Sequence, residues 1–381
     1  MHIVIAPNSF KNSLDATSCA QAIKEGLLQS RLKCTCTCFP VGDGGDGTAA
    51  LLIKKWKCNR ITATVHDPLM RSIPASFGFI NKNKTAIIEM ADASGIKLLK
   101  AEELNPLHAT SFGTGELIKK ALDKGAKKII LCIGGSATVD GGAGILHALG
   151  FRFLDSKKKE LKDLPSYLIH LSMIDNANAN KRTFDCEFVI LCDVENFLLG
   201  ENGAAKIFGP QKGADSKNVQ TLEKALTQFR DISLKQTGVD MNAIKHGGAA
   251  GGVAAGLSVW LNAKPVKGIE YFLDATNFND VLKNADLLIT GEGSIDEQTL
   301  KGKAPYGVAK RAKQKQIPVI GLAGKIPLHK NNELNKWFDV LLSINNEPDI
   351  NEAILHTKAN LKRTAKSLGD LIAISKIKTS A

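Results

Sequence analysis

Hydrophobic and polar positions follow a rhythm of strand and helix at the start of the chain. A short apolar run with β-branched residues at His2–Ala6 predicts a buried strand. Leu14–Leu28 carries apolar residues at helical spacing, with Ser13 as a candidate N-cap. Cys34–Val41 predicts a second strand and Thr48–Trp56 a second helix. This succession favours an α/β domain with a parallel sheet.

The same rhythm returns near the other end of the chain. Three strands are predicted there, at Ala285–Thr290, Ile317–Ala323 and Phe338–Ile344. Two helices are predicted at Tyr306–Lys315 and Ile350–Leu368. Strands from the two chain ends can pair in one sheet. The middle of the chain would then be an inserted domain.

The middle of the chain has a different pattern of predicted elements. Close-spaced strands at Ile61–Val65, Ile73–Ile80 and Thr85–Ala91 indicate antiparallel pairing. Two further helices are predicted to begin at Thr114 and Gly141, and two further strands at Lys128 and Glu187. With 381 residues, the chain has the length of about two domains. We expect one α/β domain from residues 1–65 and 262–381, and a mixed α/β domain from residues 66–261.

Composition and charge exclude several classes of protein. The net charge of +12 is spread along the chain, and no aromatic residues interleave with the basic runs. A nucleic-acid surface usually needs both a basic face and stacking aromatics, so no nucleic-acid partner is expected, and the charge suits a small anionic substrate. There is no apolar run of about 18 residues and no signal peptide, so we expect a cytoplasmic protein without a membrane partner.

Three cysteines alternate with threonine at Cys34, Cys36 and Cys38. A period of two places the three thiols on one side of a strand. They could form a soft-metal site, or they could be small apolar residues on a buried face. Zinc sites more often use CxxC pairs at turns, which favours the second interpretation.

Glycine is the most informative residue type, because its 34 copies cluster. Gly-rich segments occur at Gly42–Gly47, Gly134–Gly144, Gly247–Gly256 and Gly291–Gly293. Glycine lets backbone N–H groups approach an anion closely, and a following helix adds partial positive charge. Several such turns in one chain indicate phosphate binding.

The first glycine cluster allows two interpretations. Gly42–Gly47 fits GxGxxG, and Asp67 follows at the spacing of a dinucleotide-binding fingerprint, as in an NAD-dependent hydroxy-acid dehydrogenase. Asp43 and Asp46 lie inside this loop, however, where they would repel a pyrophosphate. Two carboxylates on such a loop suit Mg²⁺ bridging to phosphates, although both can also be plain turn residues.

Other charged residues near predicted turns are candidates for phosphoryl-transfer chemistry. Lys11, Lys212 and Lys303 could neutralise a transferring phosphoryl group, although a single lysine is more often a surface residue. Asp193 ends a buried-looking strand, where open α/β sheets place functional groups, or it simply begins a turn.

Three more acids lie beside the later glycine clusters. Glu292 and Asp296 follow a strand and are compatible with metal ligation or with a helix start. Asp140 could cap the following helix or take part in catalysis.

A series of motifs in a fixed order resembles the bacterial glycerate kinase family, of the D-glycerate 2-kinase type. The segments that carry the resemblance are IAPNSFKNSL, VGDGGDGT, IEMADASG, NPLHATSFGTGELI, IGGSATVDGGAG, CDVEN, IFGPQKGA, GGAAGG and ITGEGSIDEQTLKGKAP. Each is weak alone, but together they span nearly the whole chain. Two positions depart from the family pattern, since Asn8 replaces the usual acid of PDSFK and Asp46 replaces the usual glutamate of DGGEGT.

The resemblance implies a fold and a reaction. It implies a flavodoxin-like Rossmann-type domain built from both chain ends and an inserted domain similar to restriction endonucleases. It also implies transfer of the γ-phosphoryl group from ATP with Mg²⁺ to a hydroxyl of D-glycerate, with 2-phosphoglycerate as the favoured product. The enzyme would be a monomer or a homodimer.

Residue roles follow from this resemblance together with the spacing. Asp193 would be the general base or the group that orients the hydroxyl, and Lys11 would stabilise the transferring phosphoryl group. The expected phosphate- and nucleotide-binding residues are Gly134, Gly135, Ser136, Thr138, Gly141, Gly291, Gly293 and Lys303. The expected substrate-binding residues are Ser111, Gly113, Thr114 and Lys212. The expected Mg²⁺ ligands are Asp43, Asp46, Glu292 and Asp296.

Overall fold

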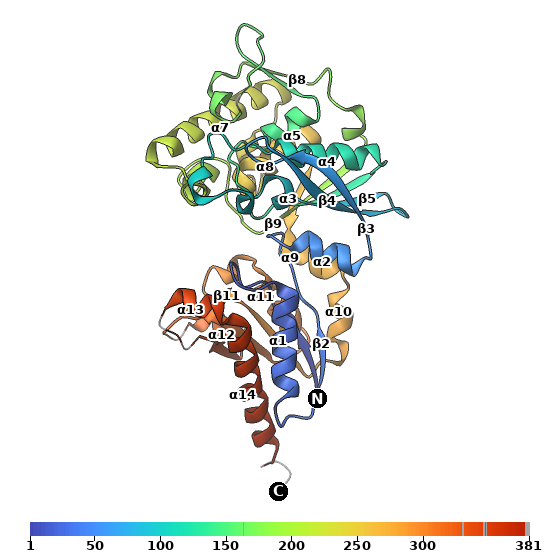
Figure 1. The fold of residues 1–381 in the computed structure, drawn as a ribbon, viewed down its shortest axis with the longest axis vertical. Coiled ribbons are helices and arrows are strands. Elements are labelled where there is room, and N and C mark those ends of the chain that lie inside the picture. The colour runs from blue at the N-terminus through green and yellow to red at the C-terminus, as the bar shows by residue number, and fades with distance from the viewer. Residues whose placement is uncertain (163, 330, 346, 348, 378–381) are drawn as a thin grey trace. The chain divides into compact units, whose positions relative to one another are not determined.

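A computed structural model describes residues 1–162, 164–329, 331–345, 347 and 349–377 of the chain (Figure 1). These residues form two compact units, each with its own sheet and core. The first unit consists of Met1–Asp43 and Ile269–Ala381, and the second of Gly44–Gly268. The first unit therefore contains both ends of the chain.

The first unit is built on a five-stranded parallel sheet in the order β13-β12-β11-β1-β2. The strands are β1 (His2–Ile5), β2 (Thr35–Cys38), β11 (Leu287–Ser294), β12 (Val319–Lys325) and β13 (Val340–Ser343). Numbered within this unit, the order is 2-1-3-4-5, which is the order of flavodoxin-like doubly wound sheets. Strands from the two chain ends thus share one sheet, as the sequence pattern predicts.

Helices cover this sheet because both of its faces are apolar. Ile3 and Ile5 belong to a core with α1 (Ala16–Leu28) and α14 (Thr357–Ile377), which lie side by side in Figure 1, and the intervening Val4 is also buried. Burial on both faces is typical of parallel sheets. The remaining helices that lie in or reach this unit are α9 (Gly268–Ala275), α10 (Phe278–Val281), α11 (Ala304–Lys313), α12 (Asn332–Asn335) and α13 (Ile350–Leu355).

The second unit contains a six-stranded mixed sheet in the order β10-β9-β6-β5-β4-β3. The strands are β3 (Asn59–His66), β4 (Ser72–Ile80), β5 (Thr85–Glu89), β6 (Lys128–Cys132), β9 (Glu187–Cys192) and β10 (Lys264–Lys267). The pairs β3–β4 and β4–β5 are antiparallel, whereas β5, β6, β9 and β10 run parallel. A small antiparallel sheet pairs β7 (Arg152–Leu154) with β8 (Met173–Asp175).

One large apolar core holds the second unit together and includes Phe77, Phe151 and Phe229. Its helices are α2 (Thr48–Lys55), α3 (Ala91–Ser94), α4 (Phe112–Asp123), α5 (Ala143–Ala148), α6 (Ala204–Phe208), α7 (Ser216–Thr237) and α8 (Ala249–Leu261). The expected α/β class is confirmed for the chain. The likeness of this unit to restriction endonucleases stays a prediction.

Several predicted boundaries need correction. The first unit ends at Asp43 rather than at residue 65, because β3 pairs with β4 and α2 packs against β5. It resumes at Ile269 rather than at residue 262, because β10 pairs with β9 in the second unit.

The start of one helix and the end of one strand also differ from the prediction. The N-cap of α1 is Asp15, which accepts from Ser18 N, and not Ser13. Strand β11 continues through the predicted Gly291–Gly293 turn, since Glu292 still pairs with β12. Among the described residues, no helix is both long and apolar enough to cross a membrane.

Candidate active site

The carboxyl ends of β1 and β11 form one candidate region in the first unit. These two strands are neighbours, and the chain leaves them toward opposite sides of the sheet, so they define its topological switch point. Open α/β sheets bind ligands at this position. Asn8 and Lys11 follow β1, and Asn8 N donates to the carbonyl oxygen of Gly291 at 2.9 Å. The predicted Lys11 and Gly291–Gly293 are therefore brought to the same edge.

Two buried acids lie at this edge. Asp43 and Glu292 are 8% and 7% exposed, and Asp43 accepts from the side-chain amide of Asn8 at 2.9 Å. Glu292 accepts from Thr299 Oγ1 at 2.7 Å. Burial raises the pKa of Glu292 to about 7, and Asp43 adds to this, while Lys303 and Lys11 act in the opposite direction. The Asn8 amide can donate this hydrogen bond, whereas an acid at position 8 would need a proton to do so.

Two glycines at this edge have different roles. A Cβ at Gly291 would lie 2.2 Å from the carbonyl oxygen of Leu322, so this glycine is needed for strand packing. A Cβ at Gly293 would meet nothing closer than Lys11 N at 3.9 Å, which leaves open space beside that amide. Lys303 is the residue directly before α11, a ten-residue helix whose N-terminus favours anions.

Asp296 has a local structural role. Its carboxylate accepts from Gln298 N at 2.9 Å and from Ser294 Oγ at 3.2 Å, so it caps the short turn that follows β11. We therefore remove Asp296 from the predicted metal ligands.

The carboxyl ends of β5, β6 and β9 form the candidate region of the second unit. These strands are parallel neighbours and end at Glu89, Cys132 and Cys192. The Gly134–Gly142 turn follows β6, and Asp193 directly follows β9. The predicted phosphate-binding turn and the predicted base are therefore at one edge of one sheet.

Lys212 lies beneath this turn and is 3% exposed. Its Nζ donates to Ser136 Oγ at 2.8 Å and to the carbonyl oxygen of Thr138 at 2.7 Å. Burial lowers the pKa of Lys212 to about 7, although the nearby Asp140 and Asp193 carboxylates partly oppose this shift. Lys212 is thus poised to gain a proton when an anion binds beside it.

The turn above Lys212 presents several unused hydrogen-bonding groups. Within the described part of the chain, no acceptor is assigned to the backbone N–H groups of Gly135, Ser136 and Thr138. The Thr138 hydroxyl is buried and has no partner either. Unpaired donors beside an ammonium group are what an anionic ligand requires. This arrangement supports the predicted phosphate-binding turn.

The remaining glycines of the turn allow close packing. A Cβ at Gly134 would lie 2.3 Å from Gly45 Cα, and one at Gly141 would lie 2.8 Å from the Phe229 ring. Gly134 N and Gly141 N already donate to the carbonyl oxygens of Gly44 and Gly251. We therefore assign Gly134 and Gly141 to loop packing rather than to direct phosphate contact.

Three residues predicted to bind substrate are instead part of the packed interior of the second unit. Ser111 is fully buried, and its hydroxyl donates to Asp140 at 2.6 Å and accepts from Ile145 N at 3.1 Å. Thr114 is fully buried and bonded to Ser94 Oγ at 2.7 Å. Gly113 lets α4 pack against β3. We do not retain these residues as substrate ligands.

Asp140 links the start of α4 to the start of α5. Its carboxylate accepts from the backbone N–H groups of Ser111, Gly142 and Gly144. Of the two predicted roles, capping of the helix that follows is therefore the one the structure supports.

Substituting Gly113 by alanine is expected to lower the stability of the second unit. The new Cβ would lie 1.8 Å from the backbone carbonyl oxygen of His66, which cannot move without disturbing β3. Overpacking of this kind costs about 1–3 kcal/mol or more. Thermal unfolding followed by circular dichroism should show a lower midpoint for G113A, while G293A, where space is open, should unfold close to the wild type. An unchanged G113A midpoint would contradict the packing described here.

Asp46 and Asp43 differ in their surroundings. Asp46 forms an ion pair with Lys97 in the second unit, at a side-chain exposure of 36%. Asp43 contacts Asn8 in the first unit. The sequence prediction grouped both with the metal ligands, and each lies near another buried acid of its own unit, Asp43 near Glu292 and Asp46 near Glu89.

Sequence reasoning missed two residues at the edge of the second sheet. Glu89 ends β5, accepts from Ala49 N at 2.9 Å, and has a second carboxylate oxygen that is buried without a partner. Burial raises the pKa of Glu89 to about 8. His246 is 4% exposed, and its Nδ1 lies 2.7 Å from the carbonyl oxygen of Val194, next to Asp193. A lone acid closing the apolar run of β5 was the available signal for Glu89.

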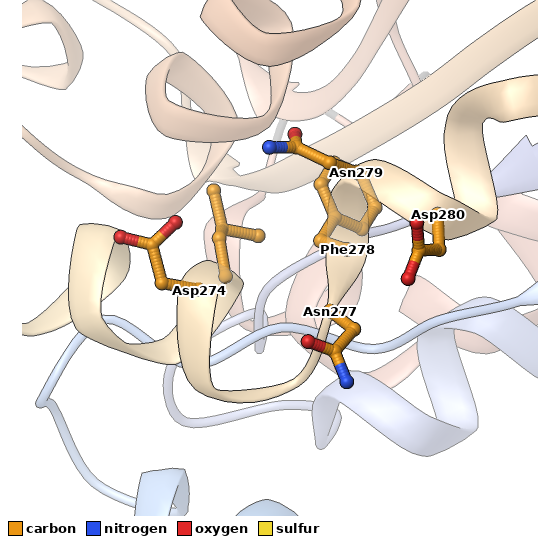
Figure 2. Close-up of a pocket in the computed structure, with 6 residues that line it drawn as sticks. Asp274, Asn277, Phe278, Asn279 and Asp280 are labelled. Carbon is orange, nitrogen blue, oxygen red and sulfur yellow. The ribbon is translucent and has the colours of Figure 1, made fainter.

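A pocket of about 200 Å³ lies elsewhere in the first unit, at the turn between α9 and α10 (Figure 2). Its two acids, Asp274 and Asp280, form ion pairs with Arg311 and Lys283 at 2.8 Å each. The pocket contains none of the candidate residues, and its charges are already compensated. It is therefore a less suitable anion site than the sheet edges.

Asp67 does not fit a dinucleotide site. One carboxylate oxygen accepts from Leu69 N and Arg71 N, and the other from Arg71 Nε at 2.5 Å. The side chain is 2% exposed, so it is not available to a ribose hydroxyl. The geometry gives no support to the dehydrogenase alternative.

Comparisons with known proteins show the family of the chain. The family model described as the glycerate kinase family matches residues 3–373. The chain belongs to the glycerate kinase family. It is 40% identical to the glycerate kinase of Bacillus subtilis (strain 168), covering 99% of each chain. It is 41% identical to the glycerate 2-kinase of Escherichia coli (strain K12), covering 98% of each.

A solved structure gives the same result. The crystal structure of a protein described as glycerate kinase 2 from Salmonella typhimurium LT2 is similar with a TM-score of 0.81 and 38% identity, covering 99% of both chains. The predicted family and the predicted kinase class are thus confirmed, and membership of a kinase family implies ATP as the phosphoryl donor.

Proposed function

We propose that this protein transfers the γ-phosphoryl group of ATP to a hydroxyl of D-glycerate. The observation that carries the proposal is the turn above Lys212, with three backbone N–H groups and the Thr138 hydroxyl left unpaired. A phosphoryl group or a carboxylate would satisfy these donors. The names of the relatives at about 40% identity support glycerate as the acceptor.

Asp193 is the proposed group that orients the glycerate hydroxyl and accepts its proton. It directly follows β9, is only partly exposed, and its charge acts on Lys212. Phosphoryl transfer requires in-line alignment and compensation of charge more than it requires covalent chemistry. A carboxylate and a buried amine at one sheet edge could provide these two functions.

The edge of the first unit is the proposed site for the triphosphate. Phosphate oxygens are favoured there by the charge of Lys303 and by the N-terminus of α11. The open space between Gly293 and Lys11 N leaves room for them. Lys11 is exposed and adds a positive charge that acts on Glu292. In this role Lys11 compensates the charge of the transferring group.

Asp43 and Glu292 are the proposed Mg²⁺ ligands. Both are buried acids, and the charge of Asp43 opposes ionisation of Glu292, a conflict that a divalent cation would relieve. In the part of the chain that the structure describes, no group of three or more His, Cys, Asp or Glu residues could hold a metal. Mg²⁺ commonly uses one or two protein carboxylates and completes its shell with phosphate oxygens and water, so two acids are sufficient for the proposed site. When bound, the ion would neutralise charge on the nucleotide phosphates.

We propose 2-phosphoglycerate as the product, following the name of the Escherichia coli relative. Incubation with MgATP and D-glycerate, followed by ³¹P NMR, tests both the activity and the product isomer. A single new resonance at the shift of authentic 2-phosphoglycerate is expected. The resonance of 3-phosphoglycerate would reject the isomer, and consumption of NADH without any use of ATP would reject the kinase.

Substituting Gly293 by alanine is expected to raise KM for ATP while leaving stability nearly unchanged. The Cβ would occupy the open space beside Lys11 N without touching other protein atoms. Loss of one phosphate hydrogen bond costs about 1.5–3 kcal/mol, which corresponds to a KM increase of roughly 10-fold or more. Steady-state kinetics at saturating glycerate measure it. An unchanged KM for ATP would remove this edge from the nucleotide site.

A further inference from the structure

The three alternating cysteines are not used by the proposed reaction. The Sγ atoms of Cys34 and Cys36 lie 3.9 Å apart on one face at the start of β2, and neither is in a disulfide. Thr35 and Thr37 point to the other face, where their hydroxyls contact the His2 ring at 2.9 and 3.2 Å. The alternation expected from the sequence is therefore realised.

The third cysteine has a different environment. The Cys38 thiol donates to the carbonyl oxygen of Ala20 in α1 at 3.5 Å. Cys34 and Cys36 instead contact each other, and all three are partly buried beside the apolar core of the first unit. The pair is thus distinct from Cys38, although the three share a face.

The chemistry of the pair suits a particular class of ligand. Burial and the neighbouring Cys34 thiol raise the pKa of Cys36 to about 12, so this thiol stays protonated until a cation displaces its proton. Thiolates select soft cations. Zinc would need more ligands than this pair, and no group of three metal-ligating residues exists among the described residues.

We propose that Cys34 and Cys36 form a two-coordinate site for a soft monovalent cation such as Cu⁺. With the zinc–sulfur length of about 2.3 Å as an upper bound for a two-coordinate bond, a linear dithiolate spans at most about 4.6 Å, which small side-chain rotations reach from 3.9 Å. Two S–H bonds break, two S–Cu bonds form and two protons leave, with no change of oxidation state. The complex carries one negative charge, and Lys24 of α1 lies near enough to Cys36 to stabilise it.

An anaerobic titration of the reduced full-length protein with Cu⁺ tests this site. Bicinchoninate, a chromophoric Cu⁺ chelator, provides the competition, and each cysteine is replaced in turn by serine. The wild type should retain one Cu⁺ per chain and release two protons. C34S and C36S should bind it at least about 100-fold more weakly, since even outer-shell changes cost 10- to 100-fold.

The matched control is Cys38→Ser, which changes the same residue type on the same face and should keep the wild-type affinity. Circular dichroism of each variant shows whether it folds. Equal loss in C38S, full retention in C34S and C36S, or complete transfer of Cu⁺ to bicinchoninate by the wild type would each overturn the two-thiolate site. Retention of Zn²⁺ as tightly as Cu⁺ would overturn its two-coordinate character.

Discussion

Replacing Asp193 by asparagine is expected to lower kcat for glycerate phosphorylation by about 10²- to 10⁴-fold, the usual contribution of a positioned general base. The carboxylate directly follows β9 at the same sheet edge as the Gly134–Gly142 turn. As the new O–P bond forms, the attacking hydroxyl must lose its proton, and an amide cannot accept it. Asparagine keeps the shape and the hydrogen-bonding capacity of the side chain, so KM for glycerate should change much less than kcat.

The matched control for this variant is Glu195→Gln, two residues further along the same segment. Glu195 forms a partly exposed ion pair with Lys267 at 2.6 Å, and removing its charge should leave turnover near the wild-type value. A coupled assay of ADP formation at saturating MgATP measures both variants. A D193N enzyme that keeps most of the wild-type kcat would exclude Asp193 as the base, and an equal loss in E195Q would indicate a general charge effect.

The position of apolar runs along the chain was sufficient to predict the main strands of the two sheets. Strand β9 has the predicted bounds, and β1 ends one residue earlier than predicted, because each run is buried on both faces and each is bounded by a turn. Pairing of strands from both chain ends also follows from the pattern. Caps were less predictable, since Ser13 and Asp15 are both suitable N-cap residues and only tertiary packing separates them.

The candidate site was harder to predict, because the decisive property is whether a polar group already has a partner. Ser111, Thr114 and Asp140 have the composition of a ligand set, but the packing of α4 and α5 satisfies them internally. Lys212 was predicted to bind substrate, although a single lysine is more often a surface residue, and its burial depends on long-range contacts with the turn after β6. Sequence identifies which residue types could bind an anion, whereas the fold decides which of them remain unpaired.

Replacing Lys212 by methionine is expected to lower kcat/KM by roughly 10²- to 10³-fold, the typical cost of removing one preorganised charge donor. The methionine fills the buried space but cannot donate to Ser136 or compensate the charge of a bound anion. Lys206→Met is the control, since Lys206 is a solvent-facing lysine of α6 paired with Glu201. Steady-state kinetics should separate the two variants clearly, and similar activity in both would place Lys212 outside the site.

The pH dependence of stability tests the buried amine independently of activity. The pKa of Lys212 is lowered from 10.5 to about 7 in the folded protein. Below pH 7 the amine is protonated in both states and the cost of burying its charge is fully present. Between the two pKa values the unfolded chain binds more protons than the folded one, so stability should rise with pH, by at most about 1.4 kcal/mol per unit.

The methionine variant lacks this proton, so its stability relative to the wild type should fall as pH rises from 7 toward 10. Denaturant unfolding of both proteins at several pH values measures the difference, with K206M again following the wild type.

Binding of an anion should be coupled to uptake of a proton by Lys212. A phosphate beside the amine favours its charged form, so binding at pH 8 should take up a proton, which calorimetry in two buffers of different ionisation enthalpy detects. Parallel stability curves for wild type and K212M, with no proton uptake, would mean that the amine is already charged in the free enzyme.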